Sequence, residues 1–296
     1  MNLYNVCKSW QAHSSRNWTR KTASCAFAFV AMALMAYPIS RALGADGLLA
    51  SGVAVNTIIN VSAASYFSGG EIAAESIVAG FSVDLATTTA VAASVPLPTL
   101  LAGVRVMVKD DLGVERFAPL FFVSPGQINY QIPPGTALGV ATMTVTNNNN
   151  VVATGSAKIL RVVPGLFAAN ANGQGVAAAL TLRVRADNSL SYEPVAQFNA
   201  QQGRMVAVPI DLGPATDQVF LVLYGTGLKF LAGLDRVSSQ VGGLNCQVLY
   251  AGAAPGFAGL DQINVRLSRQ LAGRGEVEIA LIAEARAANP LRITIQ

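Results

Sequence analysis

Histidine is nearly absent from this chain of 296 residues, and the only one, His13, lies close to the N-terminus. Beyond it no Ser-His-Asp or Cys-His catalytic group can form, and zinc or copper sites lose their commonest ligand. No Walker loop and no dinucleotide fingerprint is present, and Gly225-Thr-Gly227 predicts a tight turn instead. These absences predict a protein with no enzymatic activity and no cofactor.

Cysteine is equally scarce. Two of the three cysteines, Cys7 and Cys25, lie in the first 44 residues, which leaves Cys246 alone in the remainder. No disulfide can form within that remainder, so its stability must come from packing. Cys246 lies in an alternating run, which favours a small buried strand residue. A reactive thiol or an intermolecular bridge is the alternative, although no neighbouring His or Lys is present to lower its pKa.

The first 44 residues are unlike the rest and read as an export signal. A basic stretch ends at Arg20-Lys21, an apolar run follows from Ala23 to Ile39, and small residues at Ala42-Leu-Gly44 predict cleavage before Ala45. The run reaches the lower limit of about 17 residues for a membrane span, so an uncleaved anchor is the alternative. We therefore expect an exported protein, secreted, periplasmic or on the cell surface, which touches the membrane only through an uncleaved leader.

The basic charge of the chain is confined to this leader. Residues 1–44 hold five of the 20 basic residues and none of the 16 acidic ones, so the remainder has a net charge of −1. Long-range attraction to nucleic acid requires a basic surface. We therefore expect no nucleic-acid partner.

Short runs with apolar residues at alternate positions recur after the leader. They are separated by turn-forming clusters such as Lys109–Gly113 and Asn147–Asn150, and the runs themselves are Val104–Val108, Ala141–Val145, Leu180–Val184, Val219–Tyr224 and Val277–Leu281. Alternation suits strands with one face on a core and the other in water. Many short strands at close spacing predict an all-β fold of immunoglobulin-like β-sandwiches.

A repeat indicates that there are two such units. Gln127-Ile-Asn129 and Gln262-Ile-Asn264 are each preceded by an apolar run, Ser76–Ala86 or Val219–Lys229, and followed by a glycine and an alternating strand. We place domain 1 at residues 53–163 and domain 2 at residues 164–296. The junction is predicted at Arg161–Gly165, because Pro164-Gly165 should not continue a strand ladder.

Several motifs spread over residues 53–296 carry a family resemblance: Asn60–Phe67, Pro96–Val104, Ala118–Asn129, Val163–Phe167, Leu223–Leu228, Tyr250–Gly252, Gly259–Leu267 and Leu271–Gly275. The chain resembles the Solibacter C-terminal domain, an uncharacterised family of predicted secreted proteins of Acidobacteria. It departs from the usual pattern at Ala74–Ser76 and Ala79–Phe81. The resemblance implies export and a pair of immunoglobulin-like sandwiches, and it implies no activity.

Carboxylates are the remaining candidates for chemistry. Asp110 and Asp111 are adjacent in a predicted turn, where loop carboxylates and carbonyls would suit calcium, although polar turn residues are the simpler interpretation. Glu276 and Glu278 share one face of a predicted strand about 7 Å apart, a separation compatible with glycoside hydrolysis. Alternate polar residues on an outer face more often simply meet water.

The amides of the repeat and three tyrosines are candidates for binding. Gln127 and Asn129, like Gln262 and Asn264, either read a ligand or satisfy polar groups of a neighbouring turn, and their duplication favours the structural interpretation. A second possibility is an exposed aromatic patch for sugar or protein contact, formed by Tyr130, Tyr224 and Tyr250.

Three functional hypotheses follow. The first is a non-enzymatic protein that acts in adhesion or protein–protein contact at the cell surface or outside the cell, with an unknown protein or glycan as partner. The second is a carbohydrate-binding module, which the absence of tryptophan after residue 44 disfavours. The third is a hydrolase that uses Glu276 and Glu278.

Overall fold

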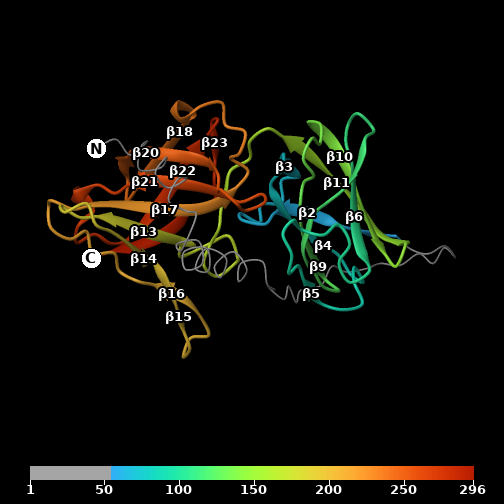
Figure 1. The fold of residues 1–296 in the computed structure, drawn as a ribbon, viewed down its shortest axis with the longest axis horizontal. Helices are drawn as coiled ribbons and strands as arrows, with labels where there is room; N and C mark the ends of the chain where they lie inside the picture. Colours follow the sequence, from blue (N-terminus) through green and yellow to red (C-terminus); the bar gives the residue numbers. More distant parts are fainter. Residues whose placement is uncertain (1–54) are drawn as a thin grey trace.

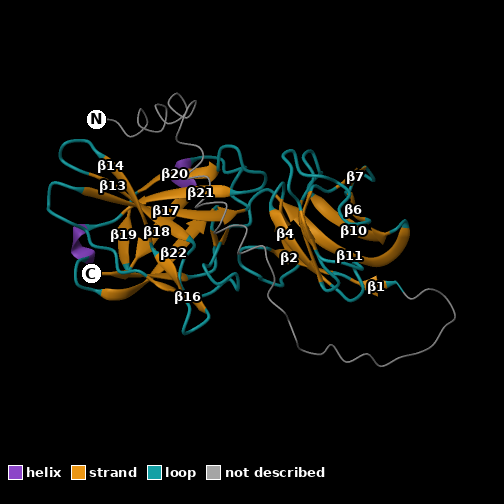
Figure 2. Ribbon diagram, turned by 60° about the horizontal axis from the view of Figure 1, so that its bottom comes forward, coloured by secondary structure: helices purple, strands orange, loops and turns teal. Residues whose placement is uncertain are grey.

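The computed structural model describes residues 55–296, which form two groups of sheets along the long axis of the molecule (Figure 1). The predicted leader, residues 1–44, and its cleavage site lie outside the described residues. Apart from the two short 3-10 turns η1 (Leu234–Arg236) and η2 (Arg269–Leu271), the regular structure is made of strands (Figure 2). The all-β fold is therefore as predicted. Within residues 55–296 no helix is long and apolar enough to cross a bilayer.

The first half of the structure, residues 55–163, contains two sheets. Sheet 1 has the order β1 (Asn56–Thr57), β11 (Asn150–Leu160), β10 (Gly139–Asn147), β6 (Val104–Lys109) and β7 (Glu115–Phe117), with β3 (Glu71–Ala73) also beside β11. Sheet 2 has the order β2 (Ile59–Ser62), β4 (Ile77–Phe81), β9 (Gln127–Gln131), β8 (Leu120–Val123) and β5 (Ala90–Val91).

The second half, residues 164–296, contains two sheets and a separate hairpin. Sheet 3 has the order β14 (Leu190–Pro194), β13 (Ala179–Val184), β17 (Gln218–Thr226), β21 (Asp261–Arg266) and β20 (Val248–Ala253), with β12 (Gly165–Leu166) also on β17. Sheet 4 has the order β19 (Leu244–Cys246), β18 (Val237–Val241), β22 (Gly275–Ala283) and β23 (Arg286–Ala287), with β24 (Leu291–Ile295) also on β22. The hairpin is β15 (Ala196–Asn199) and β16 (Arg204–Ala207).

The two halves have the same strand order. The neighbours β11-β10-β6-β7 of sheet 1 correspond to β24-β22-β18-β19 of sheet 4, and β2-β4-β9-β8 of sheet 2 correspond to β13-β17-β21-β20 of sheet 3. The correspondence keeps chain order throughout. Even the register agrees, because Asn129 pairs with Ala79 on β4 while Asn264 pairs with Val222 on β17. The internal repeat seen in the sequence is therefore a repeat of topology.

Each half encloses its own apolar core between its two sheets. Alternate residues of β6, β9, β10 and β11, including Val106, Ile128 and Met143, fill the first core. The second core is filled by residues of β17, β21, β22 and β24, with Leu221 and Ile279 among them. Two sheets that face each other over such a core form a β-sandwich. Each half is thus an immunoglobulin-like β-sandwich, as predicted.

A third apolar cluster joins the two halves. Ala64, Ile77 and Ala79 of the first half belong to the same buried cluster as Phe167 and Tyr224 of the second. We call this shared region the seam. No strand of the first half pairs with a strand of the second among the described residues. The connection therefore depends on side chains and loops rather than on a continuous sheet.

The alternation rule fails where this cluster lies. The runs Leu180–Val184 and Val219–Tyr224 form strands as predicted, but both faces of β13 and β17 are buried almost throughout. One face of these strands lines the second core, while Leu180, Phe220 and Val222 on the opposite face join the third cluster. The expectation of a water-facing side was wrong here because that side is covered.

Turn predictions can be compared directly with the backbone. The predicted turn at Asn147–Asn150 forms the β10–β11 connection, where Asn148 and Asn149 have φ of 48° and 70°, a conformation that asparagine tolerates. The prediction that Pro164-Gly165 would not continue a strand ladder was wrong. Strand β12 pairs with β17, and Gly165 lies opposite Thr226. A Cβ on Gly165 would lie 2.9 Å from the Ser62 hydroxyl, so the glycine permits close approach to the first half.

Candidate interaction sites

The two Gln-Ile-Asn blocks are built alike. The Gln127 side-chain amide donates to the side-chain Oδ1 of Asn129 at 2.9 Å, and Gln262 donates in the same way to Oδ1 of Asn264 at 2.8 Å. The intervening Ile128 and Ile263 point into the two cores. Alternation therefore places each amide pair on the opposite sheet face.

These faces are the ones that carry the third apolar cluster. Asn129 pairs across the ladder with Ala79, and Asn264 pairs with Val222, and both partners belong to that cluster. Gln127 is only 5% exposed, whereas Gln262 is half-buried. An amide pair bonded along its own strand satisfies polar groups on a covered face. The contacts thus suit the structural interpretation of the motif, which remains a prediction.

Thr226 connects the two halves by hydrogen bonds and is fully buried. Its hydroxyl accepts the backbone N–H of Ile77 at 2.9 Å and donates to the carbonyl of Gly259 at 2.6 Å. Gly227 follows with φ of +89°, and a Cβ there would lie 2.0 Å from the Val163 carbonyl oxygen. The tight turn predicted at Gly225-Thr-Gly227 was wrong, because Gly225 and Thr226 are the last two residues of β17 and the turn follows at Lys229 and Phe230.

Asp261 on β21 supports the turn that follows β17. Its carboxylate accepts the backbone N–H of Leu228 at 2.6 Å, and its exposed fraction is 2%. Burial raises the pKa of Asp261 to about 6, although backbone N–H groups of the turn and nearby Lys229 oppose the shift. The first repeat has Gly126 at the corresponding position, so the sequence repeat did not point to this carboxylate.

Ion pairs and one side-chain bond flank the seam. Lys229 pairs with Glu75 at 2.5 Å and Arg286 pairs with Glu71 at 2.6 Å, each linking the second half to the first. The Arg161 guanidinium donates to the carbonyl of Phe230 at 2.8 Å. The Gly227 carbonyl also accepts the N–H of Val163 at 3.1 Å, so the segment from Thr226 to Phe230 carries polar links to the first half at four of its residues.

The Asp110 carboxylate holds neighbouring loop segments together by hydrogen bonds. Its carboxylate accepts the backbone N–H groups of Leu112, Val114 and Ala137, and it pairs with Arg116 at 2.7 Å. These donors, led by the Ala137 N–H, lower the pKa of Asp110. The lone pairs that a calcium ion would need are directed at N–H groups, and no group of three His, Cys, Asp or Glu suited to a metal occurs in residues 55–296. Asp111 beside it is exposed.

Glu276 and Glu278 lie on the outer face of β22, on the same side as predicted. Both are exposed, and Glu276 pairs with Arg292 at 2.7 Å. Neither lines the recess beside Cys246 or the one beside Leu160 and Arg161. An open, flat position gives a carboxyl pair no means to enclose a sugar ring or to exclude water.

Cys246 lies on β19 and packs into the second core, which matches the interpretation as a small buried strand residue. It also borders a recess of about 380 Å³ at one end of the second sandwich, formed by residues 212, 215–219, 245–247 and 266–269. No lysine lies in that lining. Neither Cys246 nor the recess beside it identifies a ligand.

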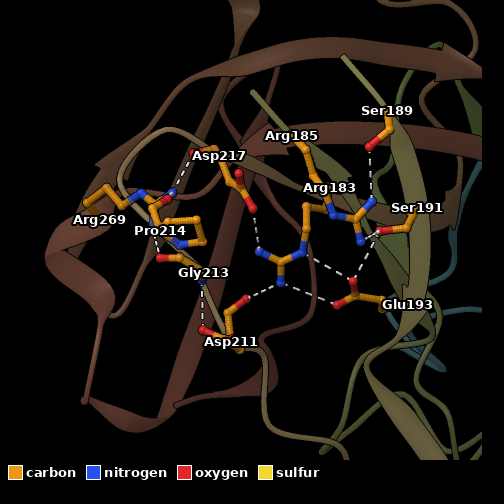
Figure 3. Close-up of polar contacts among 10 residues, drawn as sticks. All are labelled: Arg183, Arg185, Ser189, Ser191, Glu193, Asp211, Gly213, Pro214, Asp217 and Arg269. Atoms are coloured by element: carbon orange, nitrogen blue, oxygen red, sulfur yellow. Dashed lines mark hydrogen bonds and ion pairs between the residues drawn. The ribbon is translucent and has the colours of Figure 1, made fainter. Parts of the chain in front are cut away.

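A buried arginine organises the loop beside this recess (Figure 3). Arg183 bonds the carboxylates of Glu193 and Asp217 at 3.2 and 3.4 Å and the carbonyl of Asp211 at 2.6 Å. Hydrogen bonds to Glu193 raise the pKa of Arg183 further. From the other side, Arg269 donates to the carbonyls of Gly213, Pro214 and Asp217. The loop is thus held between two guanidinium groups.

Only a weak signal in the sequence points to this cluster. Arg183 interrupts the apolar positions of β13, but an arginine in an alternating strand normally reads as water-facing. Its carbonyl and carboxylate partners come from segments up to 34 residues away. Only the folded loop reveals that the charge is buried and paired.

The predicted aromatic patch does not form. Tyr130 is fully buried and donates its hydroxyl to the Asn60 side chain at 2.8 Å, and Tyr224 is buried at the seam. Tyr250 is half-buried and donates to the carbonyl of Ala253. The three rings lie in different environments, because Tyr130 points into the first core whereas Tyr224 lies on the face of β17 that the seam covers.

The β15–β16 hairpin extends away from the body of the second half (Figure 1). We call it the arm. It is anchored along β16 and at its base: Ala196 at the base and Met205 opposite Phe198 pack on Ala169, and the Asn170 amide bonds both the N–H and the carbonyl of Met205 at 2.9 Å. Phe198 on the arm is 60% exposed.

Comparisons with known proteins give no close relative. No family model and no curated protein matches the chain. Among solved structures, domains 4–9 of surface layer protein SbsC match 82% of this chain and 31% of that chain, with 10% identity and a TM-score of 0.28. Bovine butyrophilin matches 76% of this chain and 94% of that chain, with 9% identity and a TM-score of 0.22. The chain therefore spans about a third of the surface layer structure.

Proposed function

We propose that this protein is an exported, non-enzymatic module that contacts other proteins at the cell surface or outside the cell. The arm is the observation that carries the proposal. Phe198 offers an exposed aromatic side chain on a projecting hairpin, and exposed aromatics of this kind serve as anchors in protein interfaces.

The arm also has an edge suited to pairing. Asn170 bonds the backbone of Met205, so the backbone groups of Met205 point away from β15. In an antiparallel ladder both residues of such a pair point outward, so those of its partner Phe198 face the free side of β15. No other described strand pairs with β15. An extended segment of a partner can add to such an edge.

Export and family membership belong to this proposal as well. The leader of residues 1–44 supports export, and the motifs from Asn60 to Gly275 support membership of the Solibacter C-terminal domain family. The absence of histidine after residue 13 supports a role without catalysis. Hydrolysis by Glu276 and Glu278 gains nothing from their exposed position.

The test is capture of secreted and surface proteins by the immobilised full chain and by variants of the arm. Phe198→Ser removes the aromatic anchor, and Phe198→Pro removes an edge donor at a position where proline spares the β15–β16 pairing. Both should lose the captured partners. Phe67→Ser is the matched control, because Phe67 is 66% exposed in the first half. Equal capture by all four proteins, or no capture at all, would contradict the proposal.

A further inference from the structure

The outer face of sheet 1 carries a field of hydroxyl groups. Alternate residues of β10 and β11, together with one of β1, point away from the first core, and none of their hydroxyls bonds a protein group within the described residues. We call this the threonine face: Thr57, Thr142, Thr144, Thr146, Thr154 and Ser156.

These hydroxyls are in register across the sheet. Thr144 lies opposite Thr154, which lies opposite Thr57 on β1, and Thr142 lies opposite Ser156. Strand geometry gives the field a length of about 13 Å along β10 and a width of about 10 Å across three strands. A flat, regular array of donors and acceptors of this size matches a polymer that presents hydroxyls at regular intervals.

One border of the field is aromatic and cationic. Met107 continues the row of Thr144 onto β6, and Phe117 continues it onto β7 with its ring 45% exposed. The Arg105 guanidinium lies 4.9 Å from the centre of that ring. An exposed ring on a flat surface can stack on the apolar face of a sugar, and a guanidinium beside it can bind a carboxylate.

The charge of this face is positive although residues 45–296 have a net charge of −1. Arg105, Lys109 and Lys158 lie on it. Lys109 pairs with Glu115 at 3.5 Å, while Glu71 beside Lys158 is bound to Arg286. Arg105 and Lys158 have no carboxylate partner in the described part of the chain. Two free cations on a hydroxyl-rich face favour an anionic ligand.

The second half supplies an internal comparison. Strand β22 corresponds to β10, with Gly275 equivalent to Gly139, so Glu278 and Ala280 stand where Thr142 and Thr144 stand in the first half. The sandwich fold therefore does not require the threonine face. The outer face of β22 is acidic, with Glu276 and Glu278, and it carries no aromatic residue.

We infer that the threonine face binds an acidic polysaccharide laid across β10 and β11, with Phe117 stacking on a sugar ring and Arg105 and Lys158 binding carboxylates. This inference is independent of the protein contact proposed for the arm, which lies on the second half. It places the carbohydrate on the threonine face, because the predicted patch of three tyrosines does not form.

Affinity electrophoresis of the full chain through gels that contain polygalacturonate or dextran tests this inference. We expect retardation by polygalacturonate that declines with added salt, and none by dextran. Thr144→Glu should weaken binding at least about tenfold, because it brings a like charge against the polymer. Phe117→Ala and Lys158→Gln, two exposed positions, should each weaken it severalfold.

Ala280→Glu is the matched control, because it adds the same charge at the equivalent half-buried position of the second half. It should leave the affinity unchanged. The inference fails if polygalacturonate does not retard the chain, if dextran retards it equally, or if Thr144→Glu and Ala280→Glu behave alike while both keep the native circular dichroism spectrum.

Discussion

The two halves of this molecule share a strand order and differ in what they bury and what they expose. Tyr130 of the first half is fully buried and bonds Asn60, whereas the second half encloses Arg183 with its two carboxylate partners. The outer face of β10 carries hydroxyls, and that of β22 carries glutamates. Register and core alternation are thus sufficient to keep the topology, while outer faces and core ends are free to change.

The largest expected loss of stability comes from the buried Arg183 ion pairs of the second half. Arg183→Met should destabilise the second half by about 4 kcal/mol, because Asp217 is left buried without its partner. Urea unfolding followed by circular dichroism measures the change. Arg292→Met breaks an exposed pair in the same half and should change stability by less than about 0.5 kcal/mol. If both variants lost a similar amount of unfolding free energy, burial would not make the Arg183 ion pairs more important for stability than an exposed pair.

The next prediction concerns the seam. Thr226→Val keeps the shape of the side chain but leaves the N–H of Ile77 and the carbonyl of Gly259 without their partner. Each lost partner costs about 1–3 kcal/mol, so a total near 3 kcal/mol is expected. Thr142→Val removes an exposed hydroxyl and should be close to neutral in the same urea titration. An equally mild effect of Thr226→Val would show that its hydroxyl does not couple the halves.

A pH dependence follows from Asp261, which only the second repeat possesses. Its folded-state pKa of about 6 lies above the usual value of 3.8, so the folded state binds the proton more tightly than the unfolded state does. The contribution of this group therefore favours folding at pH 4 and is lost as pH rises to about 6, by on the order of 2 kcal/mol. Asp261→Asn removes this term.

The check is the difference in unfolding free energy between wild type and Asp261→Asn at pH 4 and at pH 7. Taking the difference cancels the other carboxylates, including Asp110, whose lowered pKa acts in the opposite direction. Relative to the variant, the wild type should be more stable at pH 4 than at pH 7. A difference that is the same at both pH values would rule out the assignment.

The smallest effect compares the two copies of the motif. Gln127→Ala breaks a nearly buried amide pair and should cost about 1–2 kcal/mol, whereas Gln262→Ala breaks a half-buried one and should cost about half as much. Thermal unfolding of the two variants side by side resolves the difference. A larger loss of stability in Gln262→Ala than in Gln127→Ala would show that burial does not determine how much each amide pair stabilises the fold.

Much of the fold was predictable because it depends on local patterns. All five alternating runs became strands, and the asparagine turn adopted its expected backbone. Gly139 and Gly275 begin equivalent strands, as the repeat predicted, and both have positive φ. Local alternation and turn chemistry encode these features, so one sequence is enough to find them.

The rest depended on contacts between distant segments. The outer side of β17 is buried because loops and the first half cover it. The residues of β17 alone do not predict this cover. Arg183, Thr226 and Asp261 gain their roles from partners 10 to 149 residues away. For the same reason Tyr224 is buried, whereas Tyr130 shares the core-facing side of β9 with Ile128.

The central claim is that the two sandwiches are held in one fixed arrangement by the seam. Electron–electron double resonance between spin labels at Thr142→Cys and Glu278→Cys measures this directly, one label on each half, with Cys7, Cys25 and Cys246 replaced by alanine. We predict a single narrow distance distribution that broadens in Thr226→Val. A broad distribution in the protein with Thr226 intact would contradict the claim.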